Sequence, residues 1–185
     1  MNHKRIPSFF SLVMLLSILF SACSAQTPPV TGHYAGQVEN SNAFIGLVTN
    51  GEQLGVYFCD GTQEAAPTLS GWFRGDLKGK KFDLTNDGGD HLTGEFEANR
   101  ASGTITLADG IALNFQAASV SQPAGLYRLA EMVDGADTVT GWVVLANGEL
   151  RGGRRSGTKL TSATNQPLGW IEPDINPWIE PDPQP

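Results

Sequence analysis

Cysteine and histidine are scarce in this chain, which has only two cysteines, Cys23 and Cys59, and three histidines. Neither His33 nor His91 has a second histidine or a cysteine at the spacing that a zinc site requires. The sequence also contains no Gly-x-Ser-x-Gly segment, which excludes the nucleophile turn of the α/β-hydrolases. We therefore predict no metal site, no cofactor and no catalytic residue.

Stretches rich in Ala, Leu, Glu and Lys, which are typical of helices, are nearly absent, whereas glycine is abundant at 22 residues. This is a strand-and-turn composition. Positive charge is also in short supply. Without residues 1–22 the chain keeps ten basic and 19 acidic residues, a net charge of −9 with histidine neutral. Such a balance argues against binding to nucleic acid or to anionic lipid surfaces.

Only one long hydrophobic run is present, and it lies near the N-terminus between residues 9 and 20. It follows the basic pair Lys4-Arg5 and precedes the small residues Ser21-Ala22 and then Cys23, an order typical of a signal peptide. A cysteine at this junction resembles the lipobox of bacterial lipoproteins, in which the thiol is acylated before cleavage. We therefore predict a signal peptide over residues 1–22, lipid attachment at Cys23 and a location on the bacterial cell envelope.

Two alternatives to the lipoprotein interpretation are open. Phe20 stands where a lipobox usually has leucine, so ordinary secretion with cleavage after Ala25 is the second possibility. A retained membrane helix is disfavoured, because the run is shorter than the ~20 apolar residues that span a bilayer. If Cys23 is acylated, Cys59 has no disulfide partner, whereas an unmodified Cys23 allows a disulfide between the two in an oxidising compartment. We favour Cys59 as a small buried hydrophobic residue.

Short runs of alternating apolar and polar residues, separated by Asn-Gly, Asp-Gly and similar dipeptides, predict antiparallel strands joined by tight turns. The predicted runs are Ala43–Thr49, Gln53–Cys59, Ser70–Asp76, Lys81–Thr85, His91–Glu97, Ser102–Leu107, Ile111–Ala117, Thr138–Leu145 and Glu149–Arg155. Alternation indicates one buried and one solvated face. We predict an all-β fold, a single antiparallel meander of about ten short strands, as a barrel rather than a sandwich.

The expected organisation is a signal peptide (1–22), a tether (23–31), a β-domain (32–155), and a linker with an acidic tail (156–185). The last 20 residues hold six of the 11 prolines, which predicts a disordered, extended tail. This tail repeats one motif at an eight-residue interval, Trp170-Ile-Glu-Pro-Asp and then Trp178-Ile-Glu-Pro-Asp. A second interpretation of the tail is that Trp170 and Trp178 anchor a protein partner, because Trp often contributes much of the binding energy at interfaces.

Two charged clusters each have a functional interpretation and a purely structural one. Asp83, Asp87 and Asp90 resemble part of a calcium loop, but the glutamate expected at position 12 is replaced by Gly94. A plain hairpin turn is therefore preferred. The basic segment from Arg151 to Arg155 suits phosphate or an acidic glycan, although an edge strand protected by arginine is the more common explanation.

A candidate buried polar cluster consists of Cys59, Asp60 and Arg128. Cys59-Asp60 ends one apolar strand, and Arg128 stands inside another, where its charge must reach water or find a partner. The blocks around them, Tyr57-Phe-Cys-Asp-Gly61, Gly125-Leu-Tyr-Arg128 and Gly141-Trp-Val-Val-Leu145, resemble an uncharacterised family of bacterial envelope β-domains. That resemblance implies an envelope location and a β-fold, and it implies no known activity.

These observations favour a lipid-anchored, non-enzymatic envelope domain that binds a small ligand or an envelope component. The membrane, through the N-terminal lipid, and a protein, through Trp170 and Trp178, are the expected partners. A secreted hydrolase acting through carboxylates is the alternative, because acidic residues are plentiful, and a purely structural spacer is a third possibility.

Overall fold

The computed structural model describes residues 30–171, and the predicted signal peptide, Cys23 and Trp178 lie outside them. The all-β prediction is confirmed, with twelve antiparallel strands where the sequence suggests about ten. The described residues include no helix that could span a membrane. The strands are β1 (Gly32–Val38), β2 (Phe44–Thr49), β3 (Gln53–Cys59), β4 (Ser70–Asp76), β5 (Lys81–Thr85), β6 (His91–Glu97), β7 (Arg100–Thr106), β8 (Ala112–Val120), β9 (Gly125–Val133), β10 (Ala136–Val144), β11 (Leu150–Ser156) and β12 (Lys159–Ser162).

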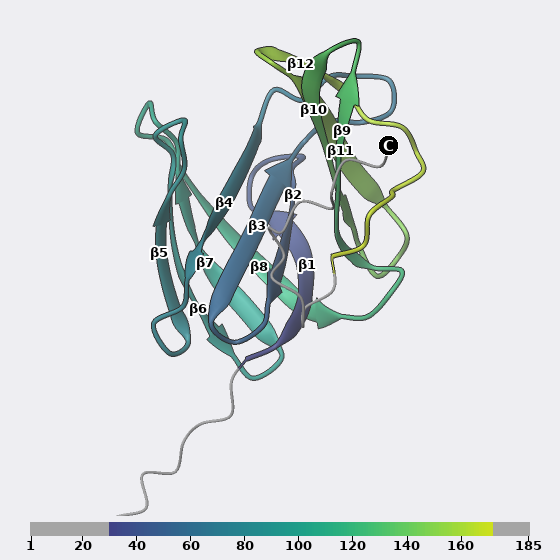
Figure 1. Cartoon of the computed structure of the whole chain (residues 1–185). Coiled ribbons are helices and arrows are strands. Elements are labelled where there is room, and N and C mark those ends of the chain that lie inside the picture. Colours follow the sequence, from purple (N-terminus) through teal and green to yellow (C-terminus); the bar gives the residue numbers. More distant parts are fainter. Residues whose placement is uncertain (1–29, 172–185) are drawn as a thin grey trace, which may run out of the picture.

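The first eight strands form one sheet that curls into a nearly closed barrel (Figure 1). Each strand pairs with the next in the two halves β1–β4 and β5–β8, and β1 also pairs with β8. Curling removes most of the exposed sheet edge and leaves β4 and β5 as the ends of the hydrogen-bonded order. Glycines with positive φ occupy the predicted turns at Gly51, Gly79 and Gly110, as tight hairpins require.

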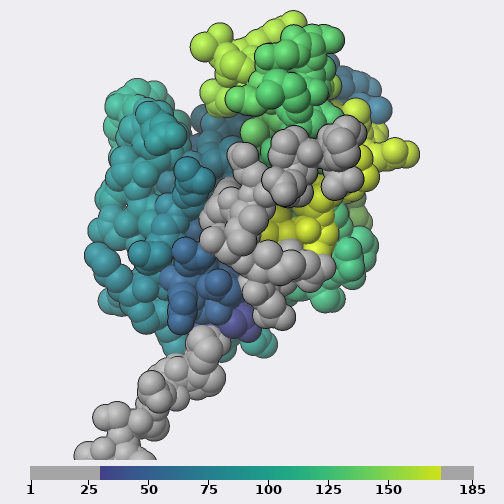
Figure 2. Space-filling view, viewed as in Figure 1, coloured from purple at the N-terminus to yellow at the C-terminus, as the bar shows by residue number. Residues whose placement is uncertain are grey.

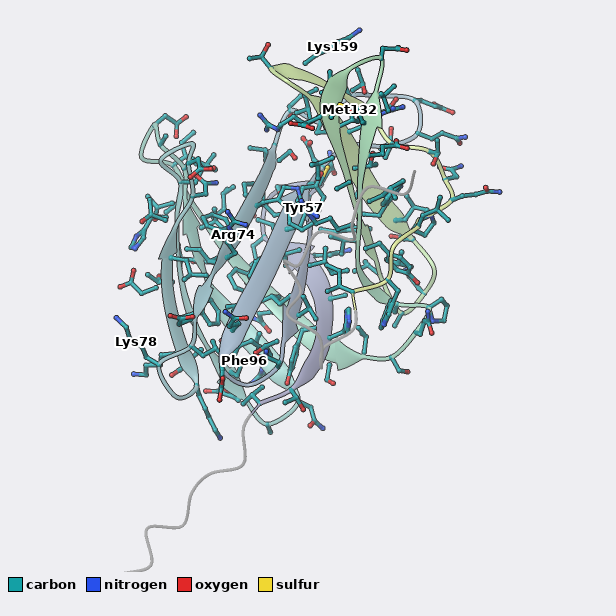
Figure 3. All side chains as sticks on the ribbon, viewed as in Figure 1. Tyr57, Arg74, Lys78, Phe96, Met132 and Lys159 are labelled. Atoms are coloured by element: carbon teal, nitrogen blue, oxygen red, sulfur yellow. The ribbon has the colours of Figure 1, made fainter. Side chains whose placement is uncertain are left out.

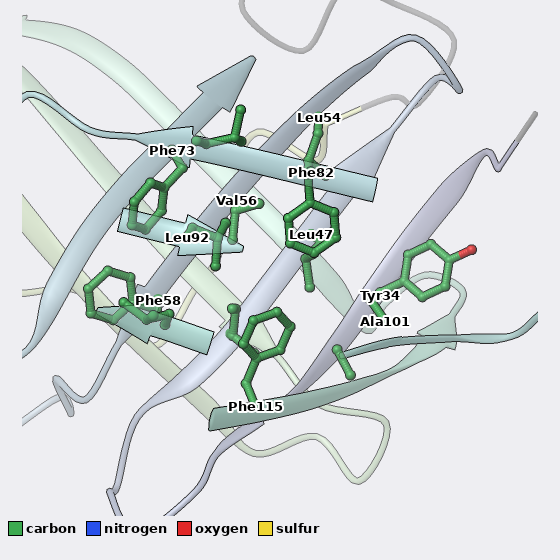
Figure 4. Close-up of a cluster of buried hydrophobic side chains, with 14 of the residues drawn as sticks. Tyr34, Leu47, Leu54, Val56, Phe58, Phe73, Phe82, Leu92, Ala101 and Phe115 are labelled. Atoms are coloured by element: carbon green, nitrogen blue, oxygen red, sulfur yellow. The ribbon is translucent and has the colours of Figure 1, made fainter. Parts of the chain in front are cut away.

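Side chains fill the barrel interior. Alternation along β5 places Phe82 and Leu84 inside and leaves the three other residues of the strand exposed. Aromatic rings from strands far apart in the sequence meet in this core, among them those of Phe73 and Phe115 (Figure 4). Each fully buried side chain of this size contributes about 1.5–3 kcal/mol relative to an exposed one. The barrel therefore has its own hydrophobic core.

The last four strands form a second sheet in the order β12-β11-β10-β9, which packs against the outside of β1–β3. Leu126 and Val143 of this sheet are fully buried against Phe44 and Val48 of the barrel. Because both of their faces are covered, β2 and β3 are buried along almost their whole length. The predicted single meander is thus divided between two sheets.

The β-domain extends beyond its predicted end at residue 155. Residues 159–162 form β12, and the chain then crosses the outer face of the second sheet, where Trp142 Nε1 donates a hydrogen bond to the Thr164 carbonyl at 2.7 Å. Tyr127, Trp142 and Val144 form an apolar cluster with Ala163 on that face, which explains why the expected linker is packed. Residues 172–185 of the predicted tail lie outside the described residues.

The arginine-rich strand is not an edge strand. β11 pairs with β10 on one side and with β12 on the other. The explanation of Arg151, Arg154 and Arg155 as protection of a sheet edge is therefore wrong. Their side chains need a different explanation.

Candidate functional site

The predicted cluster of Cys59, Asp60 and Arg128 lies around the line where the barrel meets the second sheet. We call the group Tyr57, Ser70, Trp72 and Arg128 the seam. On the face shown in Figure 2, a notch separates the teal side of the barrel from the green residues of the second sheet. Figure 3 places Tyr57 close to the second sheet, with Arg74 beside it on the barrel face.

Asp60 serves the loop between β3 and β4. Its carboxylate accepts hydrogen bonds from the backbone N–H of Thr68 at 2.8 Å, the N–H of Leu69 at 2.9 Å and the Thr68 hydroxyl. Its own N–H donates to the Leu69 carbonyl. Asp60 therefore closes this loop, as Asp commonly does in turns.

Tyr57 is the centre of the seam, and it is 1% exposed. Its ring stacks on Trp72 with centroids 4.3 Å apart, and its hydroxyl lies 3.1 Å from Ser70 Oγ. Burial raises the pKa of the Tyr57 hydroxyl well above its ordinary value, and the nearby Cys59 adds to this shift. Tyr57 is therefore a neutral hydrogen-bonding group at physiological pH.

Cys59 lies beneath the seam as a free and fully buried thiol, as the sequence predicts. Its sulfur accepts a hydrogen bond from the Gly61 N–H at 3.3 Å. Burial raises the pKa of the thiol, against the smaller opposing effect of its hydrogen bond with Tyr57. Because the thiolate is the reactive form, Cys59 is a packing residue and not a nucleophile.

Arg128 reaches the seam from the second sheet. Its guanidinium carbon lies 5.9 Å from the centre of the Trp72 ring, a cation–π distance worth ~0.5–2 kcal/mol depending on desolvation. Gly141, opposite Arg128 in register, makes this packing possible. A Cβ on Gly141 would lie 2.5 Å from the Trp72 ring and 2.8 Å from Tyr57, so any larger residue would displace both rings.

The seam presents the partly exposed ring of Trp72 and the guanidinium of Arg128, and the buried Tyr57 ring supports Trp72 from beneath. Arg74, which is exposed, follows Trp72 on the outer face of β4. Arg155 of β11 is close enough for its charge to oppose the upward pKa shift of Tyr57. This chemistry suits recognition of a planar or ring-shaped ligand that carries negative charge.

A shallow groove of about 600 Å³ lies elsewhere, between the β8–β9 connection and the β10–β11 turn. Its lining residues include no acidic, basic or histidine side chain. They are Ser119, Val120, Ser121, Gln122, Pro123, Ala124, Leu145, Ala146 and Gly148. The groove has a volume typical of ligand sites, but its lining lacks chemical groups that would select or transform a ligand, so the seam is the stronger candidate.

Two of the three aspartates of the possible calcium loop have other partners, and Asp87 is exposed. Asp83 lies 2.7 Å from His91 Nε2, and Asp90 accepts hydrogen bonds from the Asn86 amide and the Ala108 N–H. Within residues 30–171, no group of three or more His, Cys, Asp or Glu side chains is placed to hold a metal ion. The contacts at this hairpin are those of a turn.

His33 is a structural residue that sequence reasoning missed. It is 3% exposed, its Nε2 donates to the Ile171 carbonyl at 2.6 Å, and its Nδ1 accepts from the Leu126 N–H at 3.3 Å. This pattern requires the neutral ring, and burial lowers the pKa of His33 to about 4. Trp170 stacks on the ring at 3.9 Å. No local sequence pattern marks this role, because the partners are 93 or more residues away.

Comparison with protein-family models, with curated proteins and with solved structures found no match for this chain. The resemblance to envelope β-domains therefore stays an expectation from the sequence blocks.

Proposed function

We propose that this chain is a lipid-anchored, non-enzymatic β-domain of the bacterial cell envelope that binds an acidic envelope component at the seam. The envelope location follows from the signal-peptide pattern before Cys23 and from the resemblance to envelope β-domains. The observation that carries the binding proposal is the layered contact of Arg128 over Trp72 and Trp72 over Tyr57.

These groups fit an acidic glycan. An aromatic face packs against the apolar face of a sugar ring, and a guanidinium pairs with a carboxylate or phosphate through two parallel hydrogen bonds. Trp, Tyr and Arg are also the side chains that most often dominate binding energy. The ligand class we assign is therefore a sugar polymer bearing carboxylate or phosphate groups.

The distribution of charged residues supports anion binding near the second sheet. Residues 30–124, which include the barrel, contain five basic and eleven acidic residues. Residues 125–162, which form the second sheet, contain five basic and four acidic residues. An anionic ligand is repelled by the barrel surface and approaches more easily at the second sheet.

A hydrolase acting through carboxylates receives less support. The carboxylates of Asp60 and Asp90 accept hydrogen bonds within their own turns, and Asp83 is paired with His91. Hydrolysis by carboxylates needs two of them facing one substrate. Binding requires only the surface that the seam provides.

The test uses the mature chain, with polygalacturonate as the acidic probe and neutral dextran as its control. Arg128→Met keeps most of the side-chain stem and removes the charge. We expect at least a tenfold loss of polygalacturonate affinity, measured by titration calorimetry, which corresponds to about 1.4 kcal/mol. Lys78→Met is the matched control, because it removes one positive charge from an exposed turn of the barrel (Figure 3).

Equal losses in the two variants would indicate unspecific attraction by net charge and would contradict the seam as the site. Comparable binding of dextran would contradict the acidic ligand class. The anchor is tested separately by Cys23→Ser, which should release the protein from the membrane fraction. If this variant stays membrane-bound with an unchanged N-terminal mass, the lipid attachment is wrong.

A further inference from the structure

The repeated motif at the C-terminal end is one feature that the proposed function does not explain. The first copy begins at Trp170 and the second at Trp178, and both read Trp-Ile-Glu-Pro-Asp. The first two residues of the first copy are part of the described structure. They show how this sequence binds the domain.

The first copy binds along the free edge of the second sheet. The Arg128 N–H donates to the Gly169 carbonyl at 2.9 Å, and Trp170 forms an antiparallel bridge with Tyr127. The Trp170 ring stacks on His33 and meets the Tyr127 ring edge-on at 5.2 Å. Ile171 is 7% exposed in the cluster between the sheets. A Trp-Ile pair thus binds this domain by ring stacking and apolar burial.

The second copy can reach the seam. Ile171 packs in the same cluster as Val48 of β2. In the sheet register Val48 pairs with Gly55 of β3, and Gly55 pairs with Arg74 of β4, next to the seam. Arg74 is therefore two strands away from Val48, or about 10 Å at the usual strand spacing. Seven residues lead from Ile171 to Trp178 and span up to ~23 Å when extended. The length of chain is sufficient even if it bends.

The chemistry of the two parts is complementary. Residues 172–185 contain four acidic residues and no basic residue, whereas the seam and its neighbour supply Arg128 and Arg74. Proline-rich segments commonly dock on aromatic surfaces because they lose little conformational freedom on binding. The partly exposed ring of Trp72, which stacks on the buried Tyr57, provides such a surface.

We propose that the second copy, residues 178–182, docks on the seam of its own chain and competes there with the acidic ligand. The competition rests on the proposed function, whereas the docking stands without it. A tether this short gives an effective concentration on the order of millimolar. The segment therefore acts as a built-in competitor, and removing its contact raises the apparent affinity for the ligand.

The experiment detects docking of residues 178–182 on the seam by fluorine NMR, in the absence of any ligand. The full mature chain is labelled with 5-fluorotryptophan, and the resonance of Trp72 is assigned through Trp72→Phe. In Trp178→Ala the Trp72 resonance should shift, while that of Trp142, buried on the other face of the second sheet, should not. Glu180→Lys with Asp182→Lys should shift it as well. Gln184→Ala, beyond the motif, is the matched control and should have no effect.

An unmoved Trp72 resonance in Trp178→Ala would overturn the docking. A shift that depends on protein concentration, with a dimer detected by light scattering, would overturn docking within one chain and assign the seam to a second copy. Competition is read separately with polygalacturonate, which Trp178→Ala should bind at least fivefold more tightly. A shifted resonance without any polygalacturonate binding would retain the docking and reject the proposed function.

Discussion

The barrel and the second sheet reach stability in different ways. The barrel encloses a core built from its own eight strands, in which residues such as Phe58 and Phe115 are 1% exposed. The four-stranded sheet has no enclosed core, so it depends on the barrel for one face and on residues 163–170 for part of the other. The difference indicates that the barrel is the scaffold, and that the seam, where we propose that a ligand binds, lies where the second sheet joins it.

The largest expected effect comes from the barrel core. Phe115→Ala should lower the free energy of unfolding by about 3–5 kcal/mol, since it removes a fully buried ring and leaves a cavity. Urea unfolding of the mature chain measures this. Ile111→Ala is the control, because Ile111 is 53% exposed and should change stability by less than about 0.5 kcal/mol. Similar small effects at both positions would contradict a packed barrel interior.

His33 should make the attachment of the second sheet depend on pH. An unfolded histidine has a pKa near 6.5, whereas burial lowers the pKa of His33 to about 4. Between these values the unfolded chain binds the extra proton. The free energy of unfolding should therefore fall by an amount on the order of 3 kcal/mol as the pH falls from about 6.5 to about 4.

This dependence is measured by urea unfolding at a series of pH values. His33→Gln should flatten the curve in that window, and His91→Gln, on the exposed β5–β6 hairpin, should leave it unchanged. An identical slope in His33→Gln would assign the pH dependence to other groups.

Trp170→Ala should destabilise the second sheet without destabilising the barrel. Loss of the contacts with His33 and Tyr127 is expected to cost about 1–3 kcal/mol. Hydrogen exchange should quicken in β9 while β6 and β7 keep their protection. Leu168→Ala is the control, because Leu168 is 56% exposed. Uniformly faster exchange in both sheets would mean that barrel and second sheet unfold as one unit.

The smallest effect concerns the arginines of the second sheet. Arg154 lies 3.5 Å from Glu131, and both side chains are well exposed, at 38% and 42%. A double-mutant cycle with Arg154→Met and Glu131→Gln should give a coupling of ~0.2–1 kcal/mol. A coupling above about 2 kcal/mol would show that this arginine is kept for stability and would weaken the argument from the charge distribution.

Much of the local structure was predictable. The runs Gln53–Cys59 and Lys81–Thr85 coincide with β3 and β5, because alternation and adjacent turn residues are local signals. The turn at Asp134-Gly135 was missed, although both residues have positive φ and Asp-Gly is a typical hairpin pair. The site was predicted only in part. Arg128 belongs to the seam and Cys59 lies beneath it, but Asp60 closes its own loop, and no pattern pointed to Trp72.

The sequence by itself determined the strands, their turns and the all-β class, since these depend on residues close together in the chain. The division into two sheets was decided by the tertiary structure. The strands of both sheets have similar sequence patterns, and only the packing of one sheet on the other distinguishes them. The same holds for the seam. Trp72 and Arg128 are 56 positions apart, and only the packing of the second sheet on β1–β3 brings a guanidinium over that ring.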